Sequence, residues 1–551
     1  MHNILRSFIC LFMVAILIIT VISCGNNEGV EPVEIYNYAS ESPIQESAKP
    51  NDSTKPSTIP QPEEIEIVSK LPLNLSEINA IAESTIDVDI TYEAEDAALS
   101  GGTKAESSQS GYTGSGYVTN FTSPDTDKVT FHITIPENSY YNLTFISAAP
   151  YGDKINNILI DSNFIGELPS KGKNFQPYTI EKVYMDKGDH EIAISHSWGW
   201  FLLDSLNIKA SEPFDTSIFT VPSKLINKNA DDNTKRLMKF LSDVYGKYII
   251  SGQYSENGMY SNEFTAIRTE TGRYPAMAGL DLIDYTPSRV LRGTSSKAVD
   301  SAIQWWEKGG LVTFAWHWNA PTKYLPDTNE NPWWSGFYSR ATNIDLEKIM
   351  NGEDEEGYNL LLEDIDAIAE QLKKLQDAKV PILWRPLHEA SGGWFWWGNK
   401  GPEPYIALWK LLYDRLTNEH QLNNLIWVWN AQAAEWYPGD QYVDIIGEDI
   451  YPGEKQYGSQ YGKFSQALKY TETKKIIALT ENGCLFDPDL AFKDNARWAW
   501  FATWSGDFVI NKNNGNLSEQ YTEKSMLKKV YEHERVLSLI DIPDIKTYHL
   551  D

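Results

Sequence analysis

Eight short apolar runs recur between residues 248 and 504, and most are separated by stretches long enough to hold a helix. Helical periodicity is clear in several of these stretches, for example Tyr358–Ala378 and Pro404–Asn418. Parallel strands that are buried on both faces read as continuous apolar runs, and each needs a crossover connection to the next. The pattern predicts an α/β fold, a (β/α)₈ TIM barrel over residues 222–551. The runs are Tyr248–Gln253, Tyr274–Leu280, Leu311–His317, Pro381–His388, Leu425–Trp429, Val443–Glu448, Lys475–Thr480 and Phe501–Trp504.

A doubly wound open sheet is the alternative α/β fold. Such sheets bind nucleotides through a glycine-rich phosphate loop that follows a strand. No such loop follows any of the eight runs, so the barrel is favoured.

The pattern is different over residues 89–211, where short β-rich runs are separated by Gly, Asn and Asp. Strands at this spacing, with turn residues between them, are typical of a β-sandwich of the jelly-roll kind. We expect an independent domain there. Its expected strands are Gly116–Asn120, Lys128–Ile135, Tyr140–Ala148, His190–His196 and Phe201–Ile208.

The N-terminus has the pattern of a secretory signal. Arg6 precedes an uncharged run from Ser7 to Ser23, which is slightly short of the ~20 apolar residues that a transmembrane helix needs. Val21 to Cys24 resembles a bacterial lipobox, in which the thiol of Cys24 would carry lipid; the alternative is an incidental cysteine beside an ordinary cleavage site. We therefore expect a signal peptide at residues 1–23 and a secreted, cell-surface lipoprotein anchored in a membrane.

Residues 24–88 are expected to form a disordered spacer. Seven prolines lie between Gly25 and Pro72 among Ser, Thr, Asn, Glu and Lys, with no Phe or Trp. Such a segment cannot bury enough apolar surface to fold, and prolines keep it extended. It would hold the folded domains away from the membrane.

The net charge of −29 argues against nucleic acid as a partner, because a phosphate backbone is bound by clustered Lys and Arg. A neutral polymer fits better. Once residues 1–23 are removed, Cys484 is the only cysteine beyond Cys24, so the folded domains have no internal disulfide. We expect a monomer.

Two glutamates follow strands that should be inaccessible to charge. Glu389 ends the fourth apolar run and Glu481 ends the seventh. Burying an unpaired carboxylate is costly, so such residues are either partnered or functional. Active sites of TIM barrels lie at the C-terminal ends of the strands, and strands four and seven face each other across the mouth. Two carboxylates across a cleft are the arrangement that glycoside hydrolysis requires.

Other side chains near these ends suit a sugar site. Alternation along the fourth run places Arg385 beneath Glu389, where its guanidinium would orient a carboxylate and lower its pKa. His317 and His388 have no third ligand at zinc spacing, so they are either bonded to backbone carbonyls or used for hydrogen bonding at the site. Pyranose rings stack on indole, and tryptophans cluster at these ends. They are Trp316, Trp318, Trp394, Trp396, Trp397 and Trp504.

The segments Trp384–Glu389, Gly392–Gly398, Ala315–Trp318, Asp449–Pro452 and Thr480–Gly483 resemble glycoside hydrolase family 26, most of whose members are β-mannanases. The resemblance covers about residues 225–545. It implies that Glu389 is the general acid/base and Glu481 the nucleophile, and that catalysis needs no cofactor. It also implies that His388 and Tyr451 bond substrate or nucleophile and that His317, Trp394 and Trp504 line the subsites next to the scissile bond. Arg385 and Asp449, from their places on the strands, complete the expected substrate-binding set.

The earlier domain resembles a family 35 carbohydrate-binding module through Tyr92–Ala97, Gly111–Val118 and Leu203–Leu206. This resemblance implies a structural calcium ion held by Glu93, Glu95 and Asp204, in keeping with the preference of Ca²⁺ for oxygen ligands. Trp198 and Trp200 are the only tryptophans of this domain, and they are candidates for either a ligand platform or core packing.

The sequence thus predicts a retaining endo-β-1,4-mannanase that acts on mannan, galactomannan or glucomannan. The alternatives are a β-glycanase of the same fold acting on mixed-linkage β-glucan or β-1,3-xylan, and a non-catalytic surface protein that binds glycans. The presence of both Glu389 and Glu481 counts against the last.

Overall fold

The computed structural model describes Leu73, Leu75 and residues 87–124, 126–255, 258 and 261–550, except for the side chain of Trp198. The expected signal peptide, Cys24 and most of the expected spacer lie outside these residues. Among the residues that are described, no helix combines the length and the apolar character needed to cross a membrane.

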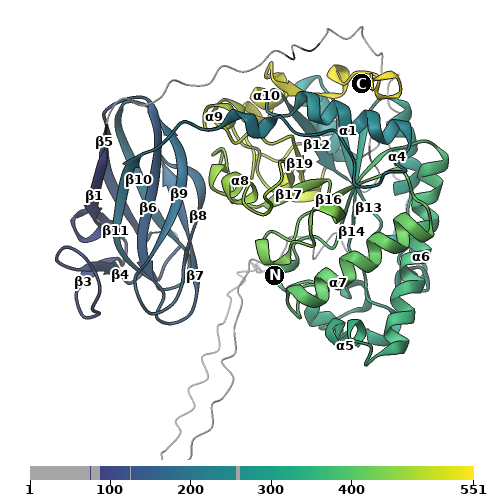
Figure 1. The fold of residues 1–551 in the computed structure, drawn as a ribbon, viewed down its shortest axis with the longest axis horizontal. Helices are drawn as coiled ribbons and strands as arrows, with labels where there is room; N and C mark the ends of the chain where they lie inside the picture. Colours follow the sequence, from purple (N-terminus) through teal and green to yellow (C-terminus); the bar gives the residue numbers. More distant parts are fainter. Residues whose placement is uncertain are drawn as a thin grey trace, which may run out of the picture. The chain divides into compact units, whose positions relative to one another are not determined.

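Two antiparallel sheets make up the N-terminal domain (Figure 1). One has the strand order β3-β4-β11-β6-β9, with β1 paired to β11, and the other has the order β2-β5-β10-β7-β8. The strands are β1 (Asp89–Glu93), β2 (Ala98–Ser100), β3 (Lys104–Glu106), β4 (Tyr117–Thr119), β5 (Lys128–Ile135), β6 (Ser139–Ala148), β7 (Lys154–Ile160), β8 (Asn163–Ser170), β9 (Gln176–Met185), β10 (Gly188–Trp198) and β11 (Leu202–Ala210).

The expected β-sandwich is therefore present, and all five expected strands belong to it. Along β5 the residues Phe131, Ile133 and Ile135 are buried while His132 and Thr134 are exposed, which is the alternation that a sheet with one covered face requires. The expectation lacked β1, β2 and β3, which have 5, 3 and 3 residues, and also β7, β8 and β9. The last three carry Asn, Gly, Pro, Glu and Lys among their apolar residues, so their apolar pattern is weaker.

Eight parallel strands form a closed barrel in the C-terminal domain, as expected. The order runs from β13 to β19 and on to β12, and the pairing of β12 with β13 closes the ring. A short additional strand, β20, pairs in parallel with β12. The strands are β12 (Ile249–Tyr254), β13 (Met277–Asp281), β14 (Leu311–Trp316), β15 (Ile382–Pro386), β16 (Leu425–Trp429), β17 (Ile445–Ile450), β18 (Ile476–Asn482), β19 (Trp500–Thr503) and β20 (Val536–Leu537).

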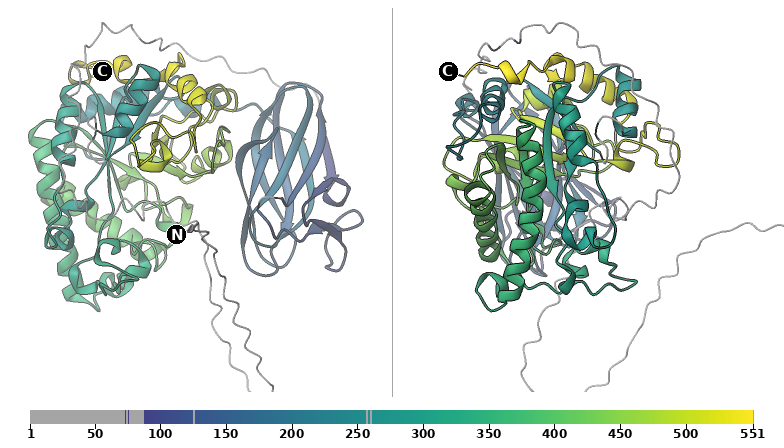
Figure 2. Two further views of the ribbon diagram at one scale, coloured as in Figure 1. Left: turned by 180° about the vertical axis from the view of Figure 1, so that it is seen from behind. Right: turned by 90° about the vertical axis from the view of Figure 1, so that its right-hand side faces the viewer.

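Helices form the outer layer of the barrel (Figure 2). Several begin at an acidic or hydroxyl cap that accepts a backbone N–H bond, such as Asp231 before α1, Ser261 before α2 and Asp354 before α6. The helices are α1 (Asp232–Val244), α2 (Asn262–Thr271), α3 (Pro287–Val290), α4 (Ala298–Glu307), α5 (Leu346–Met350), α6 (Glu355–Asp377), α7 (Pro402–Tyr413), α8 (Tyr461–Ala467), α9 (Pro488–Lys493) and α10 (Lys524–Glu532).

The barrel strands are buried along almost their whole length, and apolar side chains fill the space between strands and helices. Because all eight strands run in the same direction, their carboxyl ends meet at one end of the barrel. Polar residues at those ends are therefore brought together, whatever their separation along the chain.

Candidate active site

Three carboxyl groups meet at the carboxyl ends of the barrel strands. Glu389 follows β15, Asp449 lies near the end of β17 and Glu481 near the end of β18. One oxygen atom of each lies within 4.8 Å of one from each of the others. The expected pair, Glu389 and Glu481, thus faces a common point, and Asp449 adds a third acidic group beside it.

A β-bulge sets Asp449 beside Glu481. The register between β17 and β18 pairs Glu448 with Leu479 but Asp449 with Glu481, so Thr480 is an extra residue on β18. The Thr480 hydroxyl donates to Asp449 Oδ1 at 2.7 Å and accepts from Asn430 Nδ2 at 3.1 Å. The bulge therefore turns two neighbouring carboxylates inward at the same level.

Arg385 on β15 joins these two carboxylates. Its Nη1 donates to Asp449 Oδ2 at 2.8 Å, and its Nη2 donates to Glu481 Oε1. Its side chain is fully enclosed, and Tyr254 Oη accepts a further bond from Nη2 at 3.1 Å. The sequence placed Arg385 inside the barrel, beneath Glu389, with a guanidinium suited to orient a nucleophile that must stay ionised. The carboxylates that it bonds are Glu481, the expected nucleophile, and Asp449.

The backbone departs from strand geometry directly after β15. Leu387 and Glu389 both have positive φ angles, 51° and 52°, so the strand alternation from which Arg385 was placed beneath Glu389 ends at Pro386. The Glu389 N–H donates to the Asn430 carbonyl at 2.8 Å, which anchors this turn. Trp394 Nε1 donates to Glu389 Oε2 at 3.0 Å and orients the carboxyl group.

Burial raises the pKa of both glutamates, but not equally. The pKa of Glu389 is raised well above its ordinary value by burial and by the charges of Asp449 and Glu481. Burial also raises the pKa of Glu481, to about 7, while Arg385 acts in the opposite direction. Arg385 thus acts in the direction expected from the sequence, but burial outweighs it. These surroundings favour a proton on Glu389 over one on Glu481.

Two histidines form a chain beside the carboxylates. His317 Nδ1 bonds to Asp281, and His317 Nε2 lies 3.1 Å from His388 Nε2. The ring of Trp504 lies edge-on to His317, with 5.8 Å between ring centroids. Both histidines are buried, and Asp281 fixes the nitrogen of His317 that carries a proton.

The predicted site residues differ in accessibility. Trp394 and Tyr451 are half-buried and Trp504 is 6% exposed, whereas the side chains of Arg385 and Asp449 are fully enclosed, as is His388. Tyr451 Oη donates to Glu481 Oε2 at 2.7 Å. The sequence had placed Asn430 at a strand end near the site but had singled out neither Tyr254 nor Thr480. Tyr254 and Asn430 end strands β12 and β16 or follow them directly, which is the signal that was available for them.

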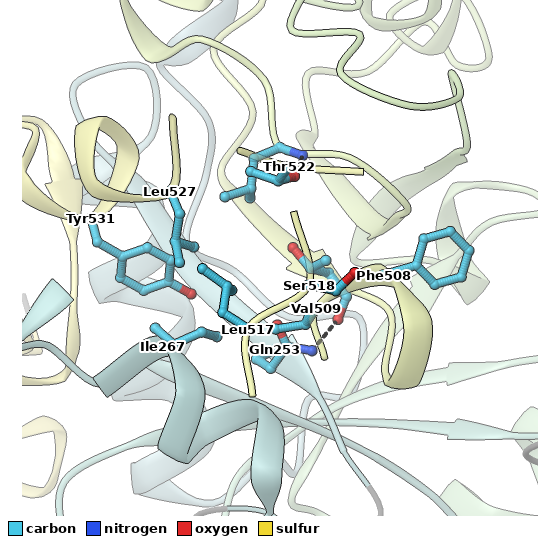
Figure 3. Close-up of a pocket in the computed structure, with 11 residues that line it drawn as sticks. Gln253, Ile267, Phe508, Val509, Leu517, Ser518, Thr522, Leu527 and Tyr531 are labelled. Atoms are coloured by element: carbon cyan, nitrogen blue, oxygen red, sulfur yellow. Dashed lines mark hydrogen bonds between the residues drawn. The ribbon is translucent and has the colours of Figure 1, made fainter. Parts of the chain in front are cut away.

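Gln253, also at a strand end, points away from the carboxyl groups. Its Nε2 donates to the Thr503 carbonyl at 3.0 Å, and it lines a cavity of about 10 Å³ between the barrel wall and the segment from Phe508 to Tyr531 (Figure 3). The space would hold about one water molecule. None of the three carboxyl groups lines this cavity, so it is separate from the candidate active site.

In the sandwich domain, the three expected calcium ligands surround the loop between β3 and β4. Thr113 Oγ1 donates to Glu93 at 2.9 Å and lies 3.0 Å from Asp204, while Glu95 accepts from the Ser115 N–H at 2.6 Å. They converge less tightly than the barrel carboxylates, since only the latter group meets the 4.8 Å spacing among the described residues.

Two aromatic side chains of this domain are exposed to solvent. Tyr151 is 74% exposed and Trp200 is 50% exposed, and their ring centroids lie 6.3 Å apart. The sequence had indicated Trp200 but not Tyr151. The side chain of Trp198 lies outside the described structure.

Models of two protein families match the chain. Residues 226–539 match the model of glycosyl hydrolase family 26, and residues 90–211 match that of the family 35 carbohydrate binding module. These ranges cover the barrel and the sandwich.

Individual relatives match both domains together. A mannan endo-1,4-β-mannosidase of Thermothelomyces thermophilus is 44% identical over 82% of this chain and 90% of its own length. Mannan endo-1,4-β-mannosidase B of Piromyces sp is 33% identical over 84% of this chain and 78% of its own. The crystal structure of the Podospora anserina GH26-CBM35 β-(1,4)-mannanase is 43% identical, with a TM-score of 0.58 over 83% of this chain and 99% of that structure.

Proposed function

Because the chain belongs to glycosyl hydrolase family 26, we propose that it is a retaining endo-β-1,4-mannanase that hydrolyses mannan, galactomannan or glucomannan. The observation that carries the proposal is the closeness of Glu389 and Glu481, whose nearest oxygens lie within 4.8 Å. Retaining glycosidases hold their carboxyl groups about 5–5.5 Å apart, whereas inverting enzymes leave about 6.5–9.5 Å for a water molecule. The names of the relatives support mannan as the polysaccharide.

The first step forms a covalent glycosyl-enzyme. Glu389, which holds the proton of the pair, gives it to the glycosidic oxygen as the bond to the anomeric carbon breaks. Glu481 Oε attacks that carbon from the opposite face and forms an ester. Arg385 and Tyr451 hold the Glu481 carboxylate through one bond to each oxygen, so the nucleophile is already oriented before the sugar arrives.

The second step returns the enzyme to its starting state. Glu389, now ionised, takes a proton from water while the water oxygen attacks the anomeric carbon and the ester bond to Glu481 breaks. Two inversions at the same carbon leave the product with the configuration of the substrate. The two carboxyl groups supply the acid, the base and the nucleophile, so this chemistry needs no cofactor.

The sandwich domain would hold the polymer near the barrel. Tyr151 and Trp200 offer apolar ring faces to solvent, and the apolar faces of pyranose rings stack on such surfaces. The match to a carbohydrate binding module supports this role.

A calcium ion in the sandwich would join Glu93, Glu95 and Asp204. Burial and the neighbouring charge of Asp204 raise the pKa of Glu93, which is the cost of placing acidic groups together without a cation. Glu95 Oε2 is buried and has no hydrogen-bond partner, so this oxygen is available as a calcium ligand. The ion would be structural.

We propose that the protein is exported and held at the cell surface by lipid. The apolar run before Cys24 and the proline-rich segment after it support export, lipidation of Cys24 and display at the cell surface on a spacer. The protein would act as a monomer.

The two glutamates should respond differently to substitution. Glu481→Ala should lower kcat on every substrate by on the order of 10⁵-fold, because no glycosyl-enzyme forms without the nucleophile. Glu389→Ala should cost about 10²–10⁴-fold on mannan but spare the first step with an activated aryl β-mannoside, giving a burst of aryl alcohol. Azide should then restore turnover and give a β-configured product.

Glu370→Ala, on the exposed face of α6, is the matched control and should keep wild-type activity. Identical behaviour of the two active-site variants, or an inverted product from the wild type, would contradict these roles.

Trp200→Ala should weaken binding of the whole protein to insoluble mannan roughly 3- to 10-fold, the value of one aromatic stacking contact. Its hydrolysis of soluble mannohexaose should be unchanged. Ile90→Ala removes an exposed apolar side chain of the same domain and serves as the control. Unaltered binding of the Trp200 variant in a depletion assay would reject the platform.

Added calcium should raise the unfolding temperature of the full chain in calorimetry, and chelator should lower it, because a ligand of the folded state stabilises by mass action, about 2.7 kcal/mol at 100 times Kd. Glu95→Gln should lose most of the response. The site assignment fails if the wild type unfolds at the same temperature with calcium and with chelator.

Expressed with its own leader in a bacterium, the protein should partition with membranes, and Cys24→Ala should release it. Cys484→Ala is the control, because Cys484 is buried in the barrel and should not affect partitioning. Membrane association of the Cys24 variant equal to that of the wild type would rule out the lipid anchor.

A further inference from the structure

We propose that Asp449 is the fixed negative charge that sets the pH window of the Glu389–Glu481 pair, and that it does not contact the substrate. This proposal rests on the proposed function and extends it, because it gives a non-reacting carboxylate a defined task in the same reaction.

The contacts of Asp449 leave it no oxygen for a sugar. Its side chain is fully enclosed. Oδ2 accepts from Arg385 Nη1 at 2.8 Å, and Oδ1 accepts from the Thr480 hydroxyl at 2.7 Å. A substrate-binding carboxylate would need an exposed oxygen, and Asp449 has none.

The backbone nevertheless holds Asp449 close to both catalytic glutamates. The bulge at Thr480 brings it level with Glu481, and its oxygen lies within 4.8 Å of one from each catalytic glutamate. At that distance, in an enclosed site, a like charge strongly disfavours ionisation of its neighbours.

The net charge of the cluster determines which glutamate holds the proton. Among the residues that the structure describes, Arg385 is the only cation with an ion pair to these carboxyl groups, and it bonds both Asp449 and Glu481. With those two ionised the cluster already carries one excess negative charge, and ionised Glu389 would add a second. The proton therefore stays on Glu389, where the first chemical step needs it.

The other groups around the cluster do not cancel the charge of Asp449. Burial raises the pKa values of Tyr254, from β12, and Tyr451, after β17, so both stay neutral donors or acceptors. Burial and Arg385 lower the pKa of His388, which stays neutral too. His317, after β14, is held by its own partner Asp281.

Removal of the Asp449 charge should shift both catalytic groups in the same direction. Its charge raises the pKa of Glu389 and that of Glu481. It also occupies one of the two terminal nitrogens of Arg385, so that Glu481 shares the guanidinium with it. In Asp449→Asn the repulsion is gone and Arg385 serves Glu481 alone. Both carboxyl groups should then ionise at lower pH.

The test is the pH dependence of kcat/KM for mannohexaose. The wild type should give a bell whose acidic limb reports Glu481 and whose alkaline limb reports Glu389. In Asp449→Asn both limbs should move to lower pH by about 1 unit or more. An activated aryl β-mannoside, which needs no acid, should lack the alkaline limb and show the shift of the acidic limb alone.

Thr480→Val is the matched control, because it removes the hydroxyl bond to Asp449 and keeps the charge. It should lower activity without moving the limbs to lower pH, and Asp449→Glu should restore the wild-type window in part. If Asp449→Asn folds but is too slow to profile, an infrared titration of its buried carboxyl groups gives the same two pKa values without turnover.

Limbs that stay in place while kcat falls would mean that Asp449 only supports Arg385, and limbs that stay in place while KM rises would mean a substrate contact. Either result overturns the proposal. A wild type that leaves mannohexaose intact would instead contradict the proposed function, so the two failures are distinguishable.

Discussion

The guanidinium of Arg385, shared between Asp449 and Glu481, is the interaction on which the rest of the site depends. All three side chains are fully enclosed, and buried charges are tolerated only when they are paired and hydrogen-bonded. Loss of the cation would leave two buried carboxylates with only the neutral donors Thr480 and Tyr451 as partners. Strands β15, β17 and β18 must therefore hold fixed positions relative to one another, which a closed barrel provides.

This shared ion pair also divides the labour between the two catalytic glutamates. Arg385 and Tyr451 both donate hydrogen bonds to the Glu481 carboxylate. Among the described side chains, Trp394 alone donates to Glu389, which also faces the negative charges of Asp449 and Glu481. Two chemically identical side chains are thus made different by their surroundings, one suited to hold a proton and the other to attack. The mechanism requires this difference before any substrate binds.

Much of this was predictable from the sequence because the controlling signal is local. Each barrel strand is a continuous apolar run, and Glu389 and Glu481 stand where such runs end, so fold and carboxyl pair follow from burial alone. That Arg385 is shared with Asp449 was not predictable. The sharing depends on the extra residue at Thr480 and on the left-handed backbone of Leu387 and Glu389, and neither feature leaves a pattern in composition or periodicity. The same holds for Tyr254, which reaches Arg385 across the barrel, and for strands β7 to β9, whose polar residues weaken the apolar pattern.

In the proposed mechanism Glu481 forms the covalent bond to the sugar, and the enclosed Asp449 never does. The most direct measurement is mass spectrometry of the protein after reaction with a 2-deoxy-2-fluoro-β-mannosyl fluoride, which slows the second step and lets the ester accumulate. One sugar per chain, attached to the peptide that contains Glu481, is the expected result. A label on Glu389 or Asp449, or enzyme that hydrolyses mannan yet is never labelled, would contradict the account.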